Sequence, residues 1–459
     1  MSIAKAVCRA QRAFFSRPAG HLFWLLVVMA LTGCALQPQA PALDHAAAAE
    51  SIRAHYEVAL SDLPQSKQRH YAQRLYRVTG DARYLPLNRA YGQRLVSQLN
   101  EEIEALGTPG YAKRQAREAV ENYSTSSKKH RRRKRMLAEW GEIVYAKSLA
   151  FDLTQMKHYG LLNERELPSY QRALDYLADV DFRPFLLDPD VMAVYAAQVA
   201  NLTFYLDELG VTDLRQEVIM AFRQQYPPAR DAMLSNAEYR NKIYGMTHFV
   251  IAASNYYQKP VAAQQFRWVF DEFAASLEQI LARTKADIYT EVGISFLLAG
   301  ESSHPAVTHL RDALLKAYDP AARMIPSEHG DTELAKGEHR NVLAIMLFDW
   351  PDRLYPGPFV NDLLDKVIAQ QRDNFLAAPV QHGFEAKHRR RGDLRRLDLG
   401  RHHQLDPVDA HVQQRRAAGG EPLTHGVVQL VQRIHAPAGH TAGLGQAREI
   451  RVLQFSEGI

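Results

Sequence analysis

Polar side chains recur at helical spacing in several otherwise apolar segments of the sequence. Tyr244, His248 and Asn255 are four and seven residues apart, so one continuous helix would place them on a single face. Asp287 and Glu291 are separated by one helical turn in a second segment. The polar residues that these and two further apolar segments contribute are Asn201, Tyr244, His248, Asn255, Asp287, Glu291, His339, Arg340 and Asn341.

Buried polar groups are costly unless they meet partners, water or a ligand. His248 and His339, with Glu291 or Asp287, could bind Zn²⁺ or another divalent metal and leave one position open for water. Alternatively, Glu291 and His339 form an acid/base pair, and Arg340 holds an anionic group such as a uronate carboxylate. A third interpretation is a hydrogen-bonded network that fixes helix register. The catalytic candidates are His248, Glu291, His339 and Asp287, and the substrate-binding candidates are Tyr244, Asn255, Arg340, Asn341 and Asn201.

The segments that carry these residues have helical periodicity from about residue 46 to residue 371. Short breaks that contain Pro, Gly, Asp or Asn separate them, and runs of alternating β-branched residues are missing. The chain is therefore predicted to be all-α. Residues up to about 122 are amphipathic and indicate surface helices that wrap the body. The least polar helices are expected at 136–153, 191–209, 242–257, 287–298 and 338–348, and amphipathic ones at 169–177, 261–283, 307–318 and 358–372.

One polar residue on each predicted apolar helix marks the distance along the sequence between successive apolar helices. The markers are Glu142, Asn201, His248, Glu291 and His339, and the gaps between them are 59, 47, 43 and 48 residues. Each step has about the length of a helical hairpin, which is typical of repeat architectures. An α/α toroid and an open α-solenoid both fit. Uniformly apolar inner helices need burial on all sides, which favours the toroid, and in a toroid the polar stripes would converge on a central cavity.

The N-terminus is predicted to be an export signal. A basic start precedes an apolar run at 22–30, which is too short to span a bilayer. The ending Leu31-Thr32-Gly33-Cys34 resembles the lipobox of bacterial lipoproteins. That resemblance implies cleavage before Cys34 and attachment of diacylglycerol and palmitate to its thiol. Ala35, in place of Asp, favours the outer membrane, with the protein facing the periplasm.

Cysteine usage agrees with this interpretation. The other cysteine, Cys8, lies in the predicted signal, so the mature chain would hold one cysteine and no disulfide.

Charge excludes a general nucleic-acid binder. The chain has a formal net charge of +5, but residues 34–380 hold 40 Lys and Arg against 43 Asp and Glu. A dense basic run at 128–135 is the exception. In an envelope protein it would meet lipid phosphates, lipopolysaccharide or an anionic polymer, or it would be a solvated helix start. The expected partners are the membrane, through the lipid anchor, and a glycan or an envelope protein.

Residues 381–459 differ in composition from the rest. They hold eight of the 19 His and eleven Arg but no Tyr, Trp, Met or Asn. A reading-frame shift, a disordered basic tail and a His-rich metal-binding segment are the competing interpretations, and no site is placed there. The predicted organisation is a signal at 1–33, a linker at 34–50, a helical domain at 51–380 and this tail.

Several motifs indicate a family. The segments Tyr244-Gly245-Met246-Thr247-His248, Glu291-Val292-Gly293-Ile294-Ser295 and Gly337-Glu338-His339-Arg340-Asn341 look like the bacterial family labelled domain of unknown function 3541. The resemblance covers roughly 50–380 and implies an all-helical protein of proteobacteria, with no assigned activity. Toroids of this shape often act on glycans, so a glycan-directed hydrolase or lyase is one expectation, by analogy of fold. A non-catalytic periplasmic scaffold or binding lipoprotein is the alternative.

Overall fold

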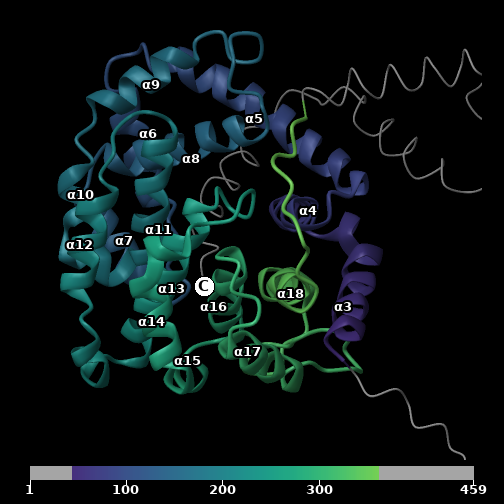
Figure 1. The fold of residues 1–459 in the computed structure, drawn as a ribbon. Coiled ribbons are helices and arrows are strands. Elements are labelled where there is room, and N and C mark those ends of the chain that lie inside the picture. Colours follow the sequence, from purple (N-terminus) through teal and green to yellow (C-terminus); the bar gives the residue numbers. More distant parts are fainter. Residues whose placement is uncertain (1–43, 361–459) are drawn as a thin grey trace, which may run out of the picture.

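The computed structural model describes residues 44–360, and within them it contains helices and no strand, which confirms the all-α prediction (Figure 1). The α-helices are α3 (His45–Ala59), α4 (Gln65–Thr79), α5 (Leu85–Ala105), α6 (Tyr111–Glu121), α7 (Lys128–Ala138), α8 (Ile143–His158), α9 (Tyr170–Asp179), α10 (Arg183–Leu187), α11 (Pro189–Glu208), α12 (Arg215–Gln225), α13 (Asn236–Ala253), α14 (Arg267–Ala275), α15 (Leu277–Arg283), α16 (Ala286–Leu298), α17 (Pro305–Lys316) and α18 (Leu334–Phe348). Short 3-10 turns are η1 (Leu60–Asp62), η2 (Ala82–Tyr84), η3 (Pro228–Met233) and η4 (Ala263–Phe266).

Left-handed residues divide or shorten two of the expected helices. The window 136–153 is not one helix, because Gly141 adopts φ +50° between α7 and α8. Helix α13 ends at Ala253 rather than near residue 257, because residues 255–257 all have positive φ. The helical spacing of apolar residues does not by itself predict these breaks in the helices.

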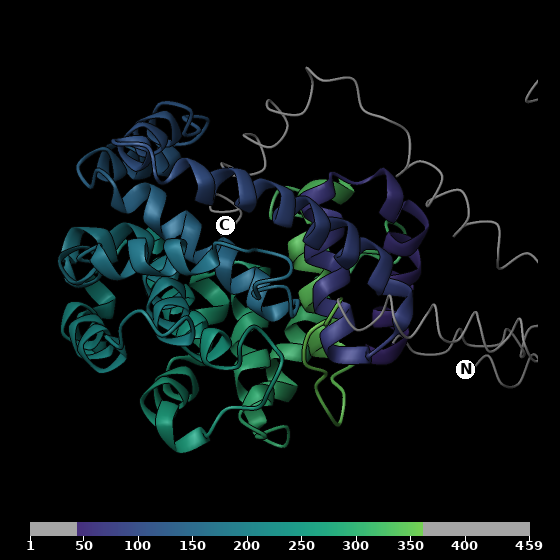
Figure 2. The ribbon, with the colours of Figure 1, turned by 90° about the horizontal axis from the view of Figure 1, so that it is seen from above.

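The apolar helices pack in the order of the sequence. Helix α8 contacts α11, α11 contacts α13, α13 contacts α16, and α16 contacts α18. The N-terminal helices complete this circuit, because α18 contacts α4, and α5 contacts both α4 and α8. Figure 2 shows these N-terminal helices, in purple, beside the green C-terminal α18. Helices from the two ends of the described chain are therefore neighbours in space.

Helix α4 is not a surface helix, contrary to the expectation for residues up to about 122, whereas α3, α5 and α6 each bury only a minority of their residues. Helix α4 has buried residues around most of its circumference, among them Arg69, His70, Gln73, Arg74 and Arg77. The reason is that α4 packs against α18 and α5, which encloses its polar side chains within the molecule. This burial of Arg and His is what makes α4 part of the candidate site.

Two further expectations concern the edges of the domain. Helix α3 begins at His45, so residues 45–50 are helical rather than linker. Cys34, the signal at 1–33, the C-terminal tail at 381–459 and most of the helix expected at 358–372 lie outside the described residues.

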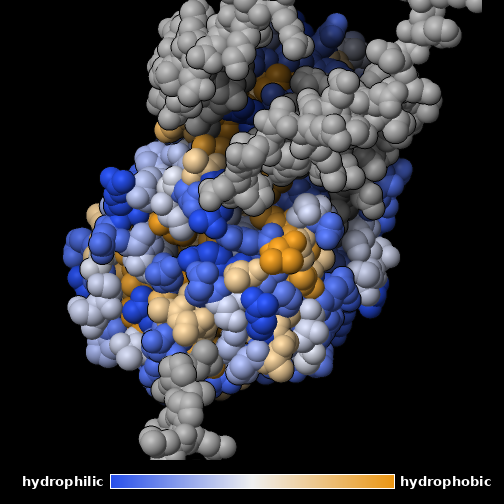
Figure 3. Space-filling model, turned by 90° about the vertical axis from the view of Figure 1, so that its right-hand side faces the viewer, coloured by the Kyte–Doolittle hydropathy of each residue, from blue (hydrophilic) through white to orange (hydrophobic). Residues whose placement is uncertain are grey.

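Hydrophilic residues cover most of the face shown in Figure 3, and hydrophobic residues form small groups on it. Among residues 44–360, no helix has the length and apolar character needed to cross a bilayer.

Gly245 allows close packing of α13 against its neighbours, and its replacement is expected to destabilise the fold. A Cβ atom there would lie 2.8 Å from Ala196 Cβ and 2.8 Å from the Phe222 ring. Gly245→Val should therefore lower the free energy of unfolding by about 1–3 kcal/mol through overpacking. Gly107→Val is the control, since its Cβ would meet only ordinary contacts. Equal urea midpoints for the two variants would contradict this packing argument.

Candidate functional site

A polar cavity of about 90 Å³ lies where α4, α8, α11, α13 and α18 meet. The described residues line it with imidazole, guanidinium, amide and phenol groups and one phenyl ring, and none of them contributes a carboxylate side chain. The lining residues are Arg69, His70, Gln73, Arg74, Phe151, Gln155, Gln198, Asn201, Tyr205, Tyr244, His248, Tyr256 and His339. Four residues predicted for the site, Asn201, Tyr244, His248 and His339, are therefore brought together here.

His248 is held by Asn201 on one side and faces Glu291 on the other. Its Nδ1 lies 2.8 Å from Asn201 Oδ1, which can only accept, so Nδ1 carries the proton of the neutral ring. Nε2 is then unprotonated. It lies 3.7 Å from Glu291 Oε2 and has no hydrogen-bond partner among the described residues.

His339 approaches the other oxygen of the Glu291 carboxyl group. Its Nδ1 lies 3.2 Å from His70 Nε2, and His70 Nδ1 lies 2.7 Å from Glu338 Oε1. If Glu338 accepts from His70, then His70 accepts from His339, which leaves His339 Nε2 unprotonated. This nitrogen lies 3.6 Å from Glu291 Oε1 and lacks a hydrogen-bond partner in the described part of the chain.

Glu291 is therefore a buried carboxyl group between two imidazole nitrogens. Only 1% of it is exposed, and burial raises its pKa to about 8, an effect that the negative Asp287 adds to and Thr247 opposes. Thr247 Oγ1 lies 2.9 Å from the Tyr244 carbonyl and 2.8 Å from Glu291 Oε2. A hydroxyl has one hydrogen, so Thr247 donates to only one of these two oxygens at a time. The burial of Glu291 outweighs this contact and favours its protonated form at neutral pH.

The histidines are shifted in the opposite direction. Burial, followed by the positive charge of Arg74, lowers the pKa of His248 to about 3. The same two causes, in the same order, hold the pKa of His70 and of His339 well below the usual range. Desolvation disfavours the charged form of each group. Near neutral pH the cluster thus contains a protonated carboxyl group and neutral imidazoles, each with one unprotonated ring nitrogen.

Arg74 brings a buried positive charge to the same cavity. The residue is 7% exposed and forms no ion pair with a carboxylate among residues 44–360. Its guanidinium lies 5.7 Å from the centre of the Tyr257 ring, and its Nε has no hydrogen-bond partner in the described structure. A buried charge without a counter-charge is costly, so this position is suited to an anionic group of a ligand.

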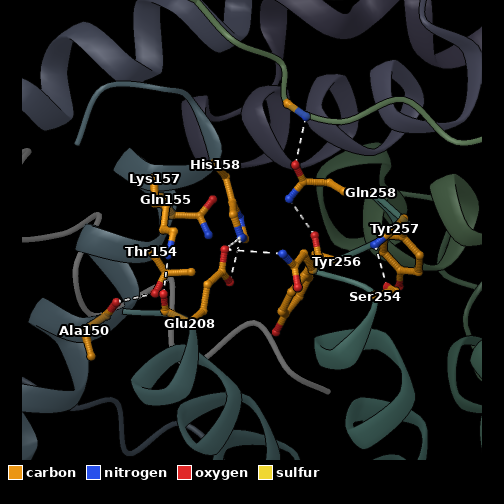
Figure 4. A network of polar contacts seen from close by, with 12 residues as sticks. Ala150, Thr154, Gln155, Lys157, His158, Glu208, Ser254, Tyr256, Tyr257 and Gln258 are labelled. Atoms are coloured by element: carbon orange, nitrogen blue, oxygen red, sulfur yellow. Dashed lines mark hydrogen bonds and ion pairs between the residues drawn. The ribbon is translucent and has the colours of Figure 1, made fainter. Parts of the chain in front are cut away.

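A left-handed turn places Tyr256 at the cavity. Asn255, Tyr256 and Tyr257 have φ values of 52°, 56° and 70°, a conformation that non-glycine residues rarely adopt. A polar network holds the turn (Figure 4): Gln258 Nε2 donates to the Asn255 carbonyl, and Asn255 Nδ2 donates to Glu208. Such strain persists where the surroundings over-determine it, often at functional sites.

The same network extends to α4 and α8. Glu208 faces His158, with both carboxylate oxygens 3.1 Å from His158 Nε2 (Figure 4). Arg77 donates to the Tyr256 carbonyl at 2.9 Å. The ring of Tyr256 stacks on Tyr205 with the ring centres 6.0 Å apart. These contacts fix Tyr256 beside His248, whose ring centre is 6.3 Å away.

The structure separates three of the predicted substrate-binding residues from the cavity. Asn255 does not share a face with Tyr244 and His248, because α13 ends before it and its amide turns to Glu208. Asn341 accepts from the Ile325 N–H at 2.7 Å, and Arg340 donates to the Ile325 carbonyl at 2.9 Å. Both residues therefore hold the loop before α18.

Two acidic residues also differ from expectation. Asp287 lies one turn before Glu291 and accepts from the Ile288 N–H, and it does not line the cavity. Glu142, the marker of the first apolar helix, precedes α8 and accepts from the Tyr176 hydroxyl at 3.3 Å. Asp287 thus acts on the site only through its charge, and Glu142 is remote from it.

The predicted metal ligands lie close together but do not converge. Residues 44–360 contain no group of three or more His, Cys, Asp or Glu side chains that could hold a metal ion. The geometry gives the reason: His248 and His339 approach different oxygens of Glu291, so their nitrogens face the carboxyl group from two sides.

Sequence reasoning missed the contribution of α4 to the site. His70, Gln73 and Arg74 are separated by helical steps and form a stripe with Arg69 and Arg77. The stripe was available in the sequence, but charged residues at that spacing usually mark a solvated face. Its burial depends on α18, which is distant in the sequence.

One of the comparisons with known proteins identifies a family. The family described as "Domain of unknown function (DUF3541)" matches residues 45–372, which is more than half of the chain. The chain belongs to this family. The match begins where α3 begins and includes every helix that forms the cavity. No curated protein and no solved structure matches the chain.

Proposed function

We propose that this member of the DUF3541 family is an acid/base enzyme that cleaves an acidic glycan by β-elimination in the bacterial envelope. The lipobox-like ending at Cys34 supports an anchor of diacylglycerol and palmitate there, on the outer membrane and facing the periplasm. We interpret the circuit of helix contacts as an α/α toroid, with the cavity near its centre. Fold-level analogy adds to this proposal but does not carry it.

The observation that carries the proposal is the combination of Arg74 with neutral imidazoles in one cavity. A buried guanidinium without a described counter-charge suits the carboxylate of a uronate sugar. Neutralisation of that carboxylate by Arg74 would acidify the adjacent C–H bond. The negative charge of the bound substrate would also raise the lowered pKa of His248, so that its unprotonated Nε2 can take this proton.

The lining favours elimination over hydrolysis. Most glycoside hydrolases place two carboxyl groups on either side of the scissile bond. No Asp or Glu among residues 44–360 lines the cavity, and Glu291 is enclosed between His248 and His339. The volume of about 90 Å³ admits the reacting edge of a sugar rather than a whole chain.

The proposed step uses three side chains. Arg74 binds the carboxylate, and the His248 ring turns from Glu291 towards the substrate, where Nε2 takes the proton from the carbon beside the carboxylate. The electron pair of that C–H bond forms a C=C bond, and the C–O bond to the leaving sugar breaks. Tyr256 donates its hydroxyl proton to the leaving oxygen, since burial raises its pKa and keeps the phenol protonated. The proton on His248 Nε2 then passes through water to the Tyr256 phenolate, which returns both side chains to their resting states beside Glu291 and His339.

Arg74→Met is the test of this proposal. Loss of a charge-assisted contact to the substrate carboxylate should lower kcat/KM by roughly 10²-fold or more. The measurement is the ultraviolet absorbance of the unsaturated product from polygalacturonate and alginate. Arg267→Met, at an exposed position, is the control and should behave like the wild type.

Three outcomes would count against the proposal. If neither polymer yields an unsaturated product, or if Arg74→Met equals the control, the elimination proposal fails and a non-catalytic binding lipoprotein becomes the better account. Loss of activity on chelation, together with metal in the purified protein, would instead favour the divalent-metal interpretation of His248, His339 and Glu291.

A further inference from the structure

A second pocket, of about 700 Å³, lies beside the cavity and is rich in positive charge. Its walls come from the start of α7, from α11, from α13 and from the turn before α16. The Lys and Arg residues that line it are Lys128, Lys129, Arg132, Arg133, Arg240 and Lys285, and Glu238 is the one acidic residue that the described part of the chain contributes to its lining. Part of the basic run at 128–135 thus forms a concave surface rather than a uniformly solvated helix start.

Arg133 is the buried cation of this basic pocket. It is 1% exposed, and its guanidinium forms no ion pair with a carboxylate among the described residues. Nε and Nη2 make long contacts to Val194 O and Gln198 Oε1, at 3.4 Å and 3.5 Å. Nη1 has no hydrogen-bond partner in the described structure. A buried guanidinium with a donor to spare, in the wall of a pocket, is a site for an anion.

The backbone adds positive potential to the same pocket. The residues that precede α7, α13 and α16 are Ser127, Ser235 and Lys285, and all three line it. The N-terminus of an α-helix carries a partial positive charge and favours anions. Three such ends, together with the Arg side chains, Lys128 and Lys285 of the lining, form an electropositive concavity.

The nearby acidic residues Glu238 and Glu328 already have hydrogen-bond partners. Glu238 forms a capping box with Ser235, accepting from its backbone N–H at 2.9 Å. Arg240 donates to Glu328 at 3.2 Å. Burial, with the neighbouring charges of Arg133 and Lys285, lowers the pKa of Lys129 to about 6, and the charge of Asp287 opposes this shift. A bound anion would favour the charged form of Lys129.

The basic pocket and the cavity share a wall. Tyr244 lines both of them. Gln198 lines the cavity and accepts from Arg133, which lines the pocket. A chain that occupies the pocket would therefore reach the cavity past the Tyr244 ring.

We infer that the basic pocket binds the anionic groups of neighbouring sugars in the same polymer, so that the substrate is a polyuronate chain rather than a single acidic sugar. This inference rests on the proposed function, since it extends the substrate of that site. The pocket has the size of a ligand site, whereas the cavity admits only one reacting edge. A membrane surface fits less well, because a flat bilayer would not reach the buried Arg133.

Binding of a defined oligogalacturonate by calorimetry tests the inference without requiring turnover. The variant Lys128→Gln/Arg132→Gln removes two exposed cations from the pocket, so loss of folding is not expected. Its Kd should rise roughly 10–100-fold, as hydrogen bonds to charged groups are lost. The control Arg131→Gln/Arg135→Gln removes the same charge from exposed positions of the same run that do not line the pocket, and it should bind like the wild type. A neutral oligosaccharide of equal length should have the same Kd for the wild type and for both double variants.

The outcomes separate this inference from the proposed function. Pocket-dependent binding without an unsaturated product would support the pocket and remove the elimination proposal. Turnover with equal Kd for the two double variants would overturn the pocket and leave the proposed function intact. Binding to vesicles of phosphatidylglycerol that is lost in Lys128→Gln/Arg132→Gln, with no oligogalacturonate binding, would overturn it in favour of a membrane contact.

Discussion

His248→Ala is expected to lower kcat for the elimination reaction by about 10²–10⁴-fold, the usual effect of removing a general base. The expectation depends on the tautomer, because the Nδ1–H of His248 donates to Asn201 Oδ1 and Nε2 is left without a proton. KM should change much less, since in the proposal Arg74, and not His248, binds the carboxylate. Initial rates over a range of polymer concentrations would separate the two parameters.

The tautomer can be tested in the same assay. Asn201→Ala removes the acceptor and should lower kcat less than His248→Ala does, with a shift in the pH profile. His309→Ala, at an exposed histidine outside the cavity, is the control. If His248→Ala keeps wild-type kcat, His248 is not the base, and the cluster is better explained as a network that fixes helix register.

Glu291 is expected to make stability fall as the pH rises above about 6.5. Its pKa is raised from an ordinary 4.5 to about 8 in the folded protein. Between these values the native state keeps a proton that the unfolded chain has released, so ΔG of unfolding decreases with pH. Each pH unit costs about 1.4 kcal/mol for one proton. Between pH 6.5 and 8 the wild type should thus lose about 2 kcal/mol to this group.

The histidines give the opposite slope at lower pH. The pKa of His248 falls from 6.5 to about 3 on folding, so below pH 6.5 the unfolded chain binds a proton that the native state does not. Stability therefore falls as the pH drops through this range. The two effects oppose each other between pH 4.5 and 6.5. Above pH 6.5 the histidine contribution levels off, but Lys147 and Asp152, whose pKa values are shifted to about 7, titrate in the same range. Comparison with a variant that lacks the Glu291 carboxyl group therefore isolates Glu291.

The variant Glu291→Gln measures how much Glu291 contributes to the pH dependence of the stability. An amide of similar shape does not titrate, so the stability difference between wild type and variant should move by about 2 kcal/mol in favour of the variant between pH 6.5 and 8. Urea unfolding at several pH values measures it. Glu278→Gln, at an exposed position, should show no such change. A constant difference for Glu291→Gln would mean that Glu291 is already ionised in the folded protein.

Much of the architecture was predictable because it depends on local periodicity. The apolar windows that contain Asn201, His248, Glu291 and His339 are helices in the structure, and their order along the chain is the order of their contacts. A polar residue in an apolar helix needs a partner, so convergence of these four was a reasonable prediction. Glu142 failed as a marker because Gly141 starts a new helix at that point.

The rest of the site depends on contacts between distant segments. His339 bonds to His70, which lies 269 residues earlier, and no spacing rule connects them. The left-handed turn at 255–257 redirected Asn255 and placed Tyr256, since its conformation is set by contacts with Arg77 and Glu208. Arg340 and Asn341 share a helix with His339, but the loop at Ile325 takes their hydrogen bonds.

The sequence by itself determined the helices, their order and the polar residues that four of them would enclose, because side-chain periodicity is a local property. Tertiary structure alone decided that α4 is buried and that Arg74 lies beside the histidines. It also decided that the basic run lines a pocket next to the cavity. Whether a charged helix face meets solvent or the interior depends on which helix packs over it, and here that helix, α18, lies at the other end of the described chain.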